Sequence, residues 1–460
     1  MSIPKVIDIV VNNNLCIGCG TCVYVCPSNA IEMKWDDYGF LIPTQLSSCD
    51  SDNTCLQVCP FNPFPEKEVE TEDELAEFFL ENTINKHTKI GKYNKIYAGF
   101  SKEYRLTSSS GGLATYIFTQ LLKRGVVNHI LSVKESSNTN FKYEYAISSH
   151  KKEIELASKT KYYPVSLSGV LKELNNLEGK VAIVGVACFI KSIRLVQHKQ
   201  PILKEKIAFL VGIICGGIKS KFFTEYLAEK AGVKYNEYLK PEFRVKDFNS
   251  KASDYSFECN KTGNNRKYTI KMKNVGDMWG TGLFKANACD FCDDVTTELS
   301  DISLGDAWLN PFINDGKGTN VVVTRSPLAD IIIEEGIESG ELYVKELPLD
   351  KFLNSQKGSY NHRHIGLHTR IQKTLRDGKI VPPKRFGKQR SSLDFRLVQL
   401  IRMKVRRKSL VTWKETTNSL FFDKKMKNSL KKLQKATQIY HYKKAFIDRF
   451  KIFIKRYFFY

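Results

Sequence analysis

The chain of 460 residues carries a net charge of +22, and 42% of its residues are hydrophobic. At about 100–200 residues per domain, this length predicts several folded units with a sizeable core, and the composition is that of an ordinary globular protein. No stretch approaches the roughly 20 consecutive apolar residues of a membrane span, and no secretory signal is visible. The expected location is therefore the cytoplasm.

The first cysteine motif is Cys16-x2-Cys19-x2-Cys22-x3-Cys26, followed by Pro27. This is the spacing of bacterial ferredoxins, in which three closely spaced thiolates wrap around a cluster and the fourth cysteine serves the other cluster. Zinc is held by paired C-x-x-C or C/H ligands, so a zinc site or a disulfide knot is the weaker alternative. The motif predicts a [4Fe–4S] cluster and electron transfer.

The second motif is Cys49-x5-Cys55-x3-Cys59, followed by Pro60. Superimposing the first spacing puts Asp52 where a cysteine is expected. A carboxylate is a harder and more labile iron ligand than a thiolate. We therefore expect a [4Fe–4S] cluster with Asp or water on one iron, or a [3Fe–4S] cluster. The inferred ligand sets are Cys16, Cys19, Cys22 and Cys59 for the first cluster, and Cys26, Cys49, Asp52 and Cys55 for the second.

The next segments predict a linker or exposed helix over 66–81, within a linker that ends at residue 92, and a first body strand over 93–104. Leu113, Ile117 and Leu121 recur at helical spacing, with an N-cap expected near Ser110 and a stop at Gly125. Free amides at this helix start would suit a phosphate, although an ordinary cap and turn is the alternative. The expected phosphate-binding residues are Ser109, Ser110, Gly111 and Gly112.

β-Branched runs alternate with helical stretches over 126–220, which indicates α/β structure, and 254–273 alternates like a β-hairpin. No G-x-G-x-x-G follows a strand, so the sequence does not support NAD binding through that fingerprint. Cys259 has no partner by spacing and is expected to be structural. His362, His364 and His368 lie beside arginines in a polar segment, which favours an exposed basic loop over a metal site.

Five further segments carry a family resemblance: SSGGLAT, TKYY, GVACFIKSIR, LVGIICGGIKS and CDFCDDVTTELSDISLGDAW. Together with the ferredoxin motifs, over residues 10–375, they resemble the family of coenzyme F-420 hydrogenase/dehydrogenase beta subunits. That family includes flavin-dependent relatives such as 7-hydroxymethyl chlorophyll a reductase and proteins of surface-polysaccharide gene clusters. The resemblance implies FAD in an α/β domain and a further iron–sulfur cluster beside it.

Carried over residue by residue, the resemblance implies that Cys188, Cys215, Cys289 and Cys292 hold a third [4Fe–4S] cluster. It also places Thr160, Lys161 and Tyr162 at the flavin, with Gly305 and Asp306 lining the same cleft. The family usually reads G-T-P-C-Q and C-H-G at its first two cysteines. Here Phe189 and Gly216 follow them instead, so no chemistry specific to the deazaflavin coenzyme is implied.

The tail is basic, since residues 384–460 carry 23 Lys and Arg against 4 Asp and Glu. Apolar residues recur in it at helical spacing: Leu393, Leu397, Leu400 or Ile401, and Val405, and later Phe446, Phe450, Phe453 and Ile454. Three interpretations stay open. The helices could pack on the body, or contact an acidic partner or the inner membrane surface. Nucleic-acid binding has no recognised fold to support it.

The expected fold is α/β, or α+β overall. It comprises a ferredoxin-like domain (1–65), a linker (66–92), a mixed α/β flavin and iron–sulfur domain (93–375) and a helical basic tail (384–460). The expected function is an oxidoreductase that passes electrons between the clusters and a small organic substrate through FAD, with a redox protein as partner. The alternatives are an electron-transfer subunit that feeds a partner enzyme, for example in surface polysaccharide biosynthesis, and an iron–sulfur regulatory protein.

Overall fold

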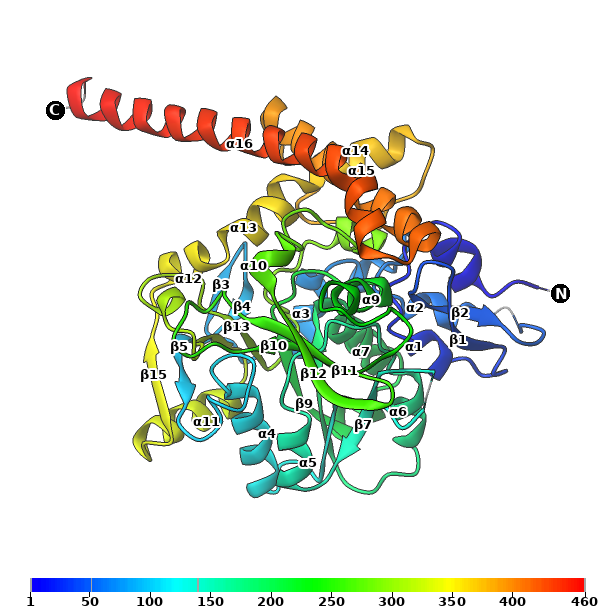
Figure 1. The fold of residues 1–460 in the computed structure, drawn as a ribbon. Coiled ribbons are helices and arrows are strands. Elements are labelled where there is room, and N and C mark those ends of the chain that lie inside the picture. The colour runs from blue at the N-terminus through cyan, green and yellow to red at the C-terminus, as the bar shows by residue number, and fades with distance from the viewer. Residues whose placement is uncertain (1, 51, 139, 459–460) are drawn as a thin grey trace.

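A computed structural model of the chain describes residues 2–50, 52–138 and 140–458 (Figure 1). The N-terminal domain lies on one side of a central α/β body, and the C-terminal helices lie across one end of that body. The expected mixed α/β fold with a helical C-terminal segment is confirmed.

Two short cysteine loops and a hairpin form the N-terminal domain. Each loop enters a one-turn helix through a residue with left-handed backbone, Gly20 (φ 77°) before α1 and Asn53 (φ 61°) before α2. The matching conformations show that the two motifs repeat each other in structure as well as in spacing. The elements are η1 (Val6–Val11), α1 (Thr21–Tyr24), β1 (Ile31–Trp35), β2 (Leu41–Gln45) and α2 (Thr54–Gln57).

The segment expected to be a linker is folded and packed. It contains η2 (Lys67–Val69), α3 (Glu72–Phe79), β3 (Asn85–His87) and β4 (Gly91–Tyr93). Thr71 and Glu74 form a capping box at the start of α3. Leu75 is fully buried, and buried Glu72 pairs with Lys191 of the body at 3.4 Å. The segment therefore fixes the N-terminal domain against the body.

An eight-stranded sheet forms the centre of the body, in the order β15-β5-β14-β13-β9-β8-β6-β7. The neighbours β13, β9, β8 and β6 run parallel, and the outer pairs are antiparallel. The two central parallel strands, β8 and β9, contain only apolar residues and glycine, as expected for strands covered on both faces. The strands are β5 (Ile96–Ser101), β6 (His129–Glu135), β7 (Tyr143–Ser148), β8 (Val181–Val186), β9 (Ile207–Ile213), β13 (Ile302–Asp306), β14 (Asn320–Thr324) and β15 (Leu342–Glu346).

Helices cover this sheet, and the loops that connect them to the strands lie at its edge. Helix α4 begins after Gly112, which is its N-cap and has a left-handed φ of 81°. The N-cap expected near Ser110 is therefore wrong. Gly125 ends the helix as expected. The helices are α4 (Leu113–Lys123), α5 (Lys151–Leu156), α6 (Ser168–Glu173), α7 (Ala187–Lys199), α8 (Ile202–Lys206), α9 (Lys221–Lys230), α10 (Met272–Val275), η3 (Asn287–Phe291), η4 (Phe312–Asn314), α11 (Pro327–Glu338), α12 (Leu349–Ser355), α13 (Lys357–Tyr360), η5 (Asn361–Ile365) and α14 (Leu367–Arg376).

A smaller three-stranded sheet packs beside the main one. It consists of β10 (Tyr238–Val245), β11 (Ser256–Lys261) and β12 (Asn264–Lys271), so the expected hairpin is confirmed. Cys259 in β11 is completely buried among apolar side chains, as expected of a structural cysteine.

The tail forms two long helices, α15 (Leu393–Thr416) and α16 (Ser419–Phe458). Ile401 and Val405 are buried as expected, whereas Leu393 and Leu397 are exposed, so the expected apolar stripe is only partly right. Trp413 is fully buried, and its indole donates to Glu225 of α9 at 2.9 Å. The first tail helix is thus part of the core. Among the helices of the described chain, none has the length and apolar character needed to cross a bilayer.

We predict that Trp413→Ala lowers the free energy of unfolding by about 3–5 kcal/mol, because it empties a buried aromatic site and leaves Glu225 without its donor. Urea denaturation measures this loss. The control, Leu393→Ala, removes an exposed side chain of the same helix and should change stability by less than about 0.5 kcal/mol. If Trp413→Ala changed the free energy of unfolding as little as Leu393→Ala does, the tail would not stabilise the body.

Candidate iron–sulfur and cofactor site

The first inferred ligand set lies together in the N-terminal domain. Burial raises the pKa of Cys22 well above its ordinary value, and the neighbouring thiols of Cys19, Cys16 and Cys59 raise it further. Burial likewise raises the pKa of Cys16 to about 12. Thiols in such a place ionise only with a cationic partner. The donor set therefore fits a thiolate-bound metal cluster.

The second inferred set lies around Cys55. Burial raises the pKa of this thiol, with Cys49, Asp52 and Cys26 adding to the shift. The Asp52 carboxylate accepts from the Thr54 hydroxyl at 2.7 Å, just as the Cys19 sulfur contacts the Thr21 hydroxyl at 3.4 Å in the first motif. Asp52 therefore takes the structural position of a cluster cysteine.

The four cysteines implied by the resemblance come together at the edge of the main sheet. Cys188 follows strand β8 and Cys215 follows β9, while Cys289 and Cys292 lie in and just after η3. Burial raises the pKa of Cys188 well above its ordinary value, and Cys292, Cys289 and Cys215 raise it further. Parallel strands bring their carboxyl ends to one edge, which explains how two cysteines far apart in sequence meet.

The N-terminal domain packs on the body near this third cysteine group. Cys19 also contributes to the raised pKa of Cys188. The backbone of Leu167 donates to the carbonyl of Cys19 at 2.8 Å. A Cβ at Gly20 would approach the Ser166 hydroxyl to 2.0 Å, so only glycine permits this contact. The first cysteine set therefore lies between the second and the third.

Arg363 is the most direct positive neighbour of the third group. Its guanidinium donates to the sulfur of Cys292 at 3.3 Å and also to the carbonyls of Cys215 and Asp294. Backbone amides add two contacts, from Gly217 to the Cys215 sulfur at 3.2 Å and from Ile218 to the Cys289 sulfur at 3.3 Å. These donors would stabilise negative charge on the sulfurs.

The exposed basic loop expected around His362–His368 is wrong. Arg363, His364 and Arg370 are each at most 5% exposed, in η5 and α14. His362 lies between Lys285 and Gln399, at 3.0 Å from each, and burial holds its pKa well below its ordinary value. The polar composition of this segment suggested exposure, but its side chains are buried against partners from distant segments of the chain, such as Lys285 and Gln399.

A cavity of about 760 Å³ opens at the carboxyl ends of β6, β8, β9 and β13, beside the third cysteine group. This volume is typical of a cofactor or ligand site. Its wall includes Ile17 from the first cysteine loop and Cys215–Ile218 from the third group. The cavity is thus bordered by Cys215 of the third group and by Ile17, which lies between Cys16 and Cys19 of the first set.

Most residues expected to bind the flavin line this cavity: Ser109, Ser110, Gly112, Thr160, Lys161, Tyr162, Gly305 and Asp306. Gly111 does not line it. A Cβ at Gly111 would lie 2.7 Å from both Asn320 Oδ1 and the carbonyl of Gly99, so this glycine is needed for close packing.

Several polar groups in the wall fit a polar cofactor. The hydroxyls of Ser108 and Ser132 and the Nε of Arg244 are buried without a hydrogen-bond partner among the described residues, and all three residues line the cavity. Burial lowers the pKa of Lys161 to about 7, and an anionic ligand would favour its charged form. Tyr162 and Trp279 meet edge to face at 4.7 Å and offer an aromatic wall. The residues present therefore fit a flavin nucleotide.

Sequence reasoning missed Arg363, Ser108, Ser132 and Tyr145. Tyr145 is buried in the cavity wall, stacks on Phe189 and donates to the carbonyl of Val184 at 2.9 Å. Ser108 stands one position before the serines that were singled out, which is the one available signal.

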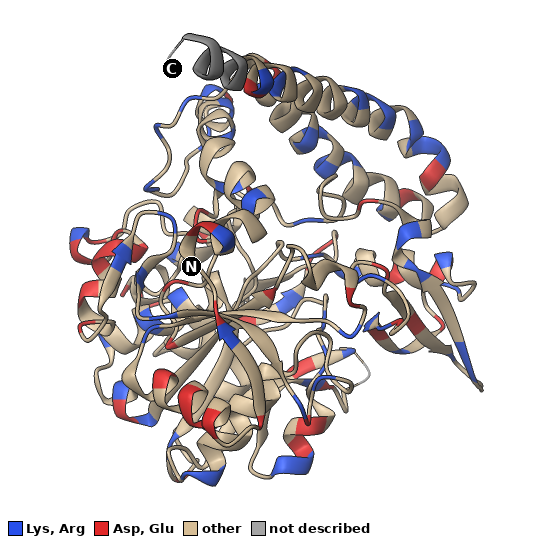
Figure 2. Cartoon of the chain, turned by 90° about the vertical axis from the view of Figure 1, so that its left-hand side faces the viewer, with Lys and Arg blue, Asp and Glu red and all other residues tan. Residues whose placement is uncertain are grey.

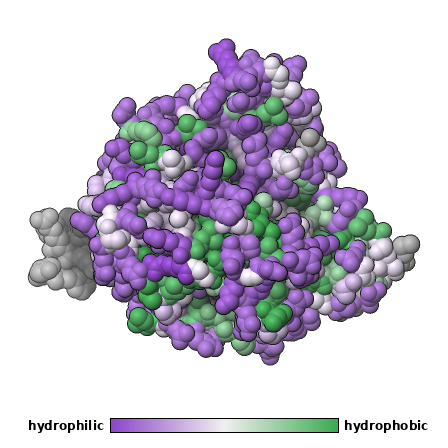
Figure 3. Space-filling view, turned by 90° about the horizontal axis from the view of Figure 1, so that it is seen from below, coloured by the Kyte–Doolittle hydropathy of each residue, from purple (hydrophilic) through white to green (hydrophobic). Residues whose placement is uncertain are grey.

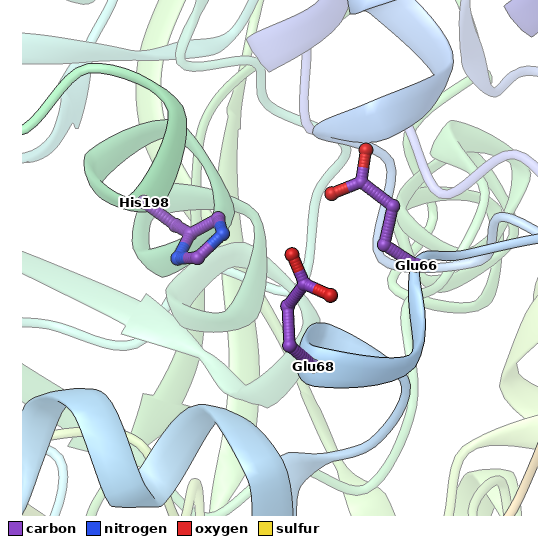
Figure 4. Close-up of side chains that lie close together, drawn as sticks. All are labelled: Glu66, Glu68 and His198. Atoms are coloured by element: carbon purple, nitrogen blue, oxygen red, sulfur yellow. The ribbon is translucent and has the colours of Figure 1, made fainter.

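A separate group of possible metal ligands, Glu66, Glu68 and His198, lies on the surface (Figure 4). Both oxygens of Glu66 already accept from Lys199 at 2.9 Å, and Gln57 donates to the same carboxylate. His198 packs edge to face on Phe78. Glu66 and His198 therefore already have partners in the protein, so their closeness does not require a metal ion.

The cysteine motifs and the fold of the N-terminal domain are those of an iron–sulfur protein. The two family models for the coenzyme F420 hydrogenase/dehydrogenase beta subunit, described as its N-term and its C terminus, match residues 96–172 and 178–349, and a 4Fe-4S dicluster domain matches residues 15–62. The chain belongs to the family of coenzyme F420 hydrogenase/dehydrogenase beta subunits, which confirms the resemblance seen in the sequence.

Individual relatives are distant. A subunit of the F(420)H(2) dehydrogenase of Methanosarcina mazei is 23% identical over 67% of this chain and 82% of its own length. The coenzyme F420-dependent sulfite reductase of Methanocaldococcus jannaschii is 21% identical over 75% of this chain, which spans half of that protein. A chain in the F420-reducing [NiFe] hydrogenase complex from Methanosarcina barkeri shares the fold, with a TM-score of 0.50 and 19% identity over 65% of this chain and 99% of that one.

We predict that Asp52→Cys changes the electron paramagnetic resonance spectrum of the second cluster, because a fourth thiolate holds iron more firmly than a carboxylate. Air exposure of the parent protein should yield the signal of an oxidised three-iron cluster, and the variant should lose that signal. Asp50→Cys, two residues away and exposed, is the matched control. Identical spectra for Asp52→Cys and the parent protein would refute the assignment.

We predict that Arg363→Gln lowers the midpoint potential of the proposed third cluster by about 65–130 mV. The basis is about 1.5–3 kcal/mol for a hydrogen bond to a charged group and about 59 mV per tenfold change for one electron. Potentiometric titration followed by paramagnetic resonance measures it. Arg376→Gln, an exposed arginine of α14, should leave the potential unchanged. A third-cluster potential that stays constant in Arg363→Gln would show that this contact does not tune the cluster.

Proposed function

We propose that this protein is an iron–sulfur flavoprotein oxidoreductase that passes electrons between its ferredoxin-type clusters and a small organic substrate through FAD. In the proposed scheme Cys16, Cys19, Cys22 and Cys59 hold the first cluster, Cys26, Cys49, Asp52 and Cys55 the second, and Cys188, Cys215, Cys289 and Cys292 the third. The flavin, when bound, would exchange one electron at a time with a cluster and two with a substrate.

One observation carries the proposal. The cavity is bordered at once by Ile17 from the first cysteine loop and by Cys215–Ile218 from the third group. A redox cofactor in this cavity would therefore lie next to two of the three proposed clusters. This arrangement would serve electron exchange, whereas a purely structural iron–sulfur protein has no need of it.

The chain's own residues supply the binding chemistry. Ser108 and Ser132 would donate their unpartnered hydroxyls, and Lys161 would offset the negative charge of a phosphate. Arg244 and Asp306 pair at 2.5 Å, which keeps the arginine oriented at the wall while its Nε stays free to donate. The aromatic wall of Tyr162 and Trp279 would exclude water from one side of the cavity.

A second candidate function is an electron-transfer subunit that feeds a partner enzyme. Two similar proteins favour it, because one is a subunit of a dehydrogenase and the other is a chain of a hydrogenase complex. In that case a redox protein, and not a small molecule, would be the electron acceptor. The chain would turn over a dye donor and an organic substrate only in the presence of the partner.

We predict about 11–12 irons and about one FAD per chain after anaerobic purification, counting four irons for each complete cubane. Iron, sulfide and flavin assays measure this composition. Iron near this level without flavin would overturn the flavoprotein and leave the second candidate. About eight irons or fewer would mean that the third cysteine group holds no cluster.

The flavin site has a matched pair of variants. Lys161→Met should weaken FAD binding because it removes the buried positive charge, and Lys161→Arg should restore much of the affinity. Both variants should keep the iron content of the parent protein, because Lys161 lies in the cavity wall and not among the cysteine groups. Equal flavin affinity in all three proteins would remove Lys161 from the site.

A further inference from the structure

The two halves of α16 have different surroundings. In the first half, Phe422, Met426, Leu433 and Ala436 are buried against the body and α15. Beyond this half the helix continues away from the body, as the red end of the ribbon in Figure 1 shows. Four large apolar side chains of the projecting half, Ile439, Tyr442, Phe446 and Phe450, are each at least half exposed. Beyond the first half, Tyr440 still packs on Phe395 and Lys443 pairs with Asp394 of α15, but packing does not explain these four exposed side chains.

One exposed stripe runs along both halves. Its members follow each other at steps of three or four residues, which keeps them on one side of a helix: Lys424, Asn428, Lys431, Lys435, Ile439, Tyr442, Phe446 and Phe450, all exposed. In the first half the stripe lies opposite the buried face, because residues two positions apart are about 200° apart around the axis. The stripe is thus basic where the helix packs and apolar where it projects.

We propose that this stripe of α16 docks the protein on an anionic lipid surface. Lys424, Lys431 and Lys435 would face the lipid phosphates, and Tyr442, Phe446 and Phe450 would enter the boundary between headgroups and acyl chains. Binding of a helix to such an interface grows with the apolar area that it inserts and with the attraction between its basic residues and anionic lipids, and this stripe offers both. The projecting half can reach the surface without unfolding the body.

Charge supports lipid as the partner. Over residues 424–450 the helix carries nine Lys and Arg against one acidic residue, Asp448. Figure 2 shows blue residues along this helix and few red ones, whereas both colours mix over the body. The lysines of the stripe form no ion pair among the described residues, so their charges are available to an anionic surface. Each basic residue near such a surface adds about fivefold to the affinity.

We predict that the full-length holoprotein sediments with vesicles of phosphatidylcholine containing phosphatidylglycerol, and not with phosphatidylcholine alone. Replacing Lys431 and Lys435 by Gln should weaken this binding by on the order of 25-fold. Replacing Phe446 and Phe450 by Ser should abolish it, since the exposed rings supply the apolar insertion. Iron and flavin content should stay unchanged in all variants.

The matched control replaces Lys123 and Lys152 by Gln. These exposed lysines lie in α4 and α5, at the opposite end of the molecule from α16 (Figure 1), on an end whose surface is largely hydrophilic (Figure 3). The control should bind vesicles as the parent protein does. Absence of vesicle binding, equal loss in the control, or binding to single-stranded RNA in place of vesicles would overturn the proposal. Because cofactor content is measured separately, failure here leaves the proposed redox function untouched.

Discussion

The buried carboxylate of Asp290 joins the three parts on which the proposed third cluster depends. It lies inside the Cys289–Cys292 loop and pairs with Lys285 of the body and Arg406 of α15, each at 3.0 Å. Burial alone would raise the pKa of Asp290, but these cations hold it below its ordinary value. Removing one partner of such a buried pair costs about 3–5 kcal/mol, because an uncompensated charge remains. The tail therefore helps to hold the cysteine loop in place.

A second layer of buried charge extends this support toward the N-terminal domain. Arg385 binds Glu298 through two hydrogen bonds of 2.7 and 3.0 Å, and it reaches Asp73 of α3 at 3.1 Å. Glu298 follows the cysteine loop, and Asp73 belongs to the segment that attaches the N-terminal domain. The groups proposed to carry electrons are thus tied together by ion pairs as well as by apolar packing. Fixed distances between redox centres are what an electron relay requires.

The sequence predicted best what depends on local spacing. The strand expected over 93–104, the alternation of strands and helices over 126–220 and the hairpin over 254–273 followed from neighbouring residues alone. It failed where partners come from distant segments. The segment around His362 looked polar and exposed, yet its partners Lys285 and Gln399 lie far away in the chain. The cap of α4 failed for another reason, since close packing on Asn320 and Tyr104 required glycines beside the serines.

The count of basic residues in the tail also gave a misleading picture of the surface charge. Several basic residues of α15 form ion pairs, whereas the lysines of the outer stripe of α16 do not. In α15, Arg406 turns inward to Asp290, and Lys414 pairs with Asp37 of the N-terminal domain at 2.6 Å. These charges offset acidic groups of the body and add nothing to an external field. In α16 the exposed lysines of the outer stripe have no such partners in the described structure. A net charge of +22 is therefore not a property of the whole surface. The largest share of the excess lies on α16, with 12 Lys and Arg against 2 Asp and Glu over 419–458, and exposed Lys404 and Arg407 of α15 add to it. An acidic partner would meet the protein at these two helices.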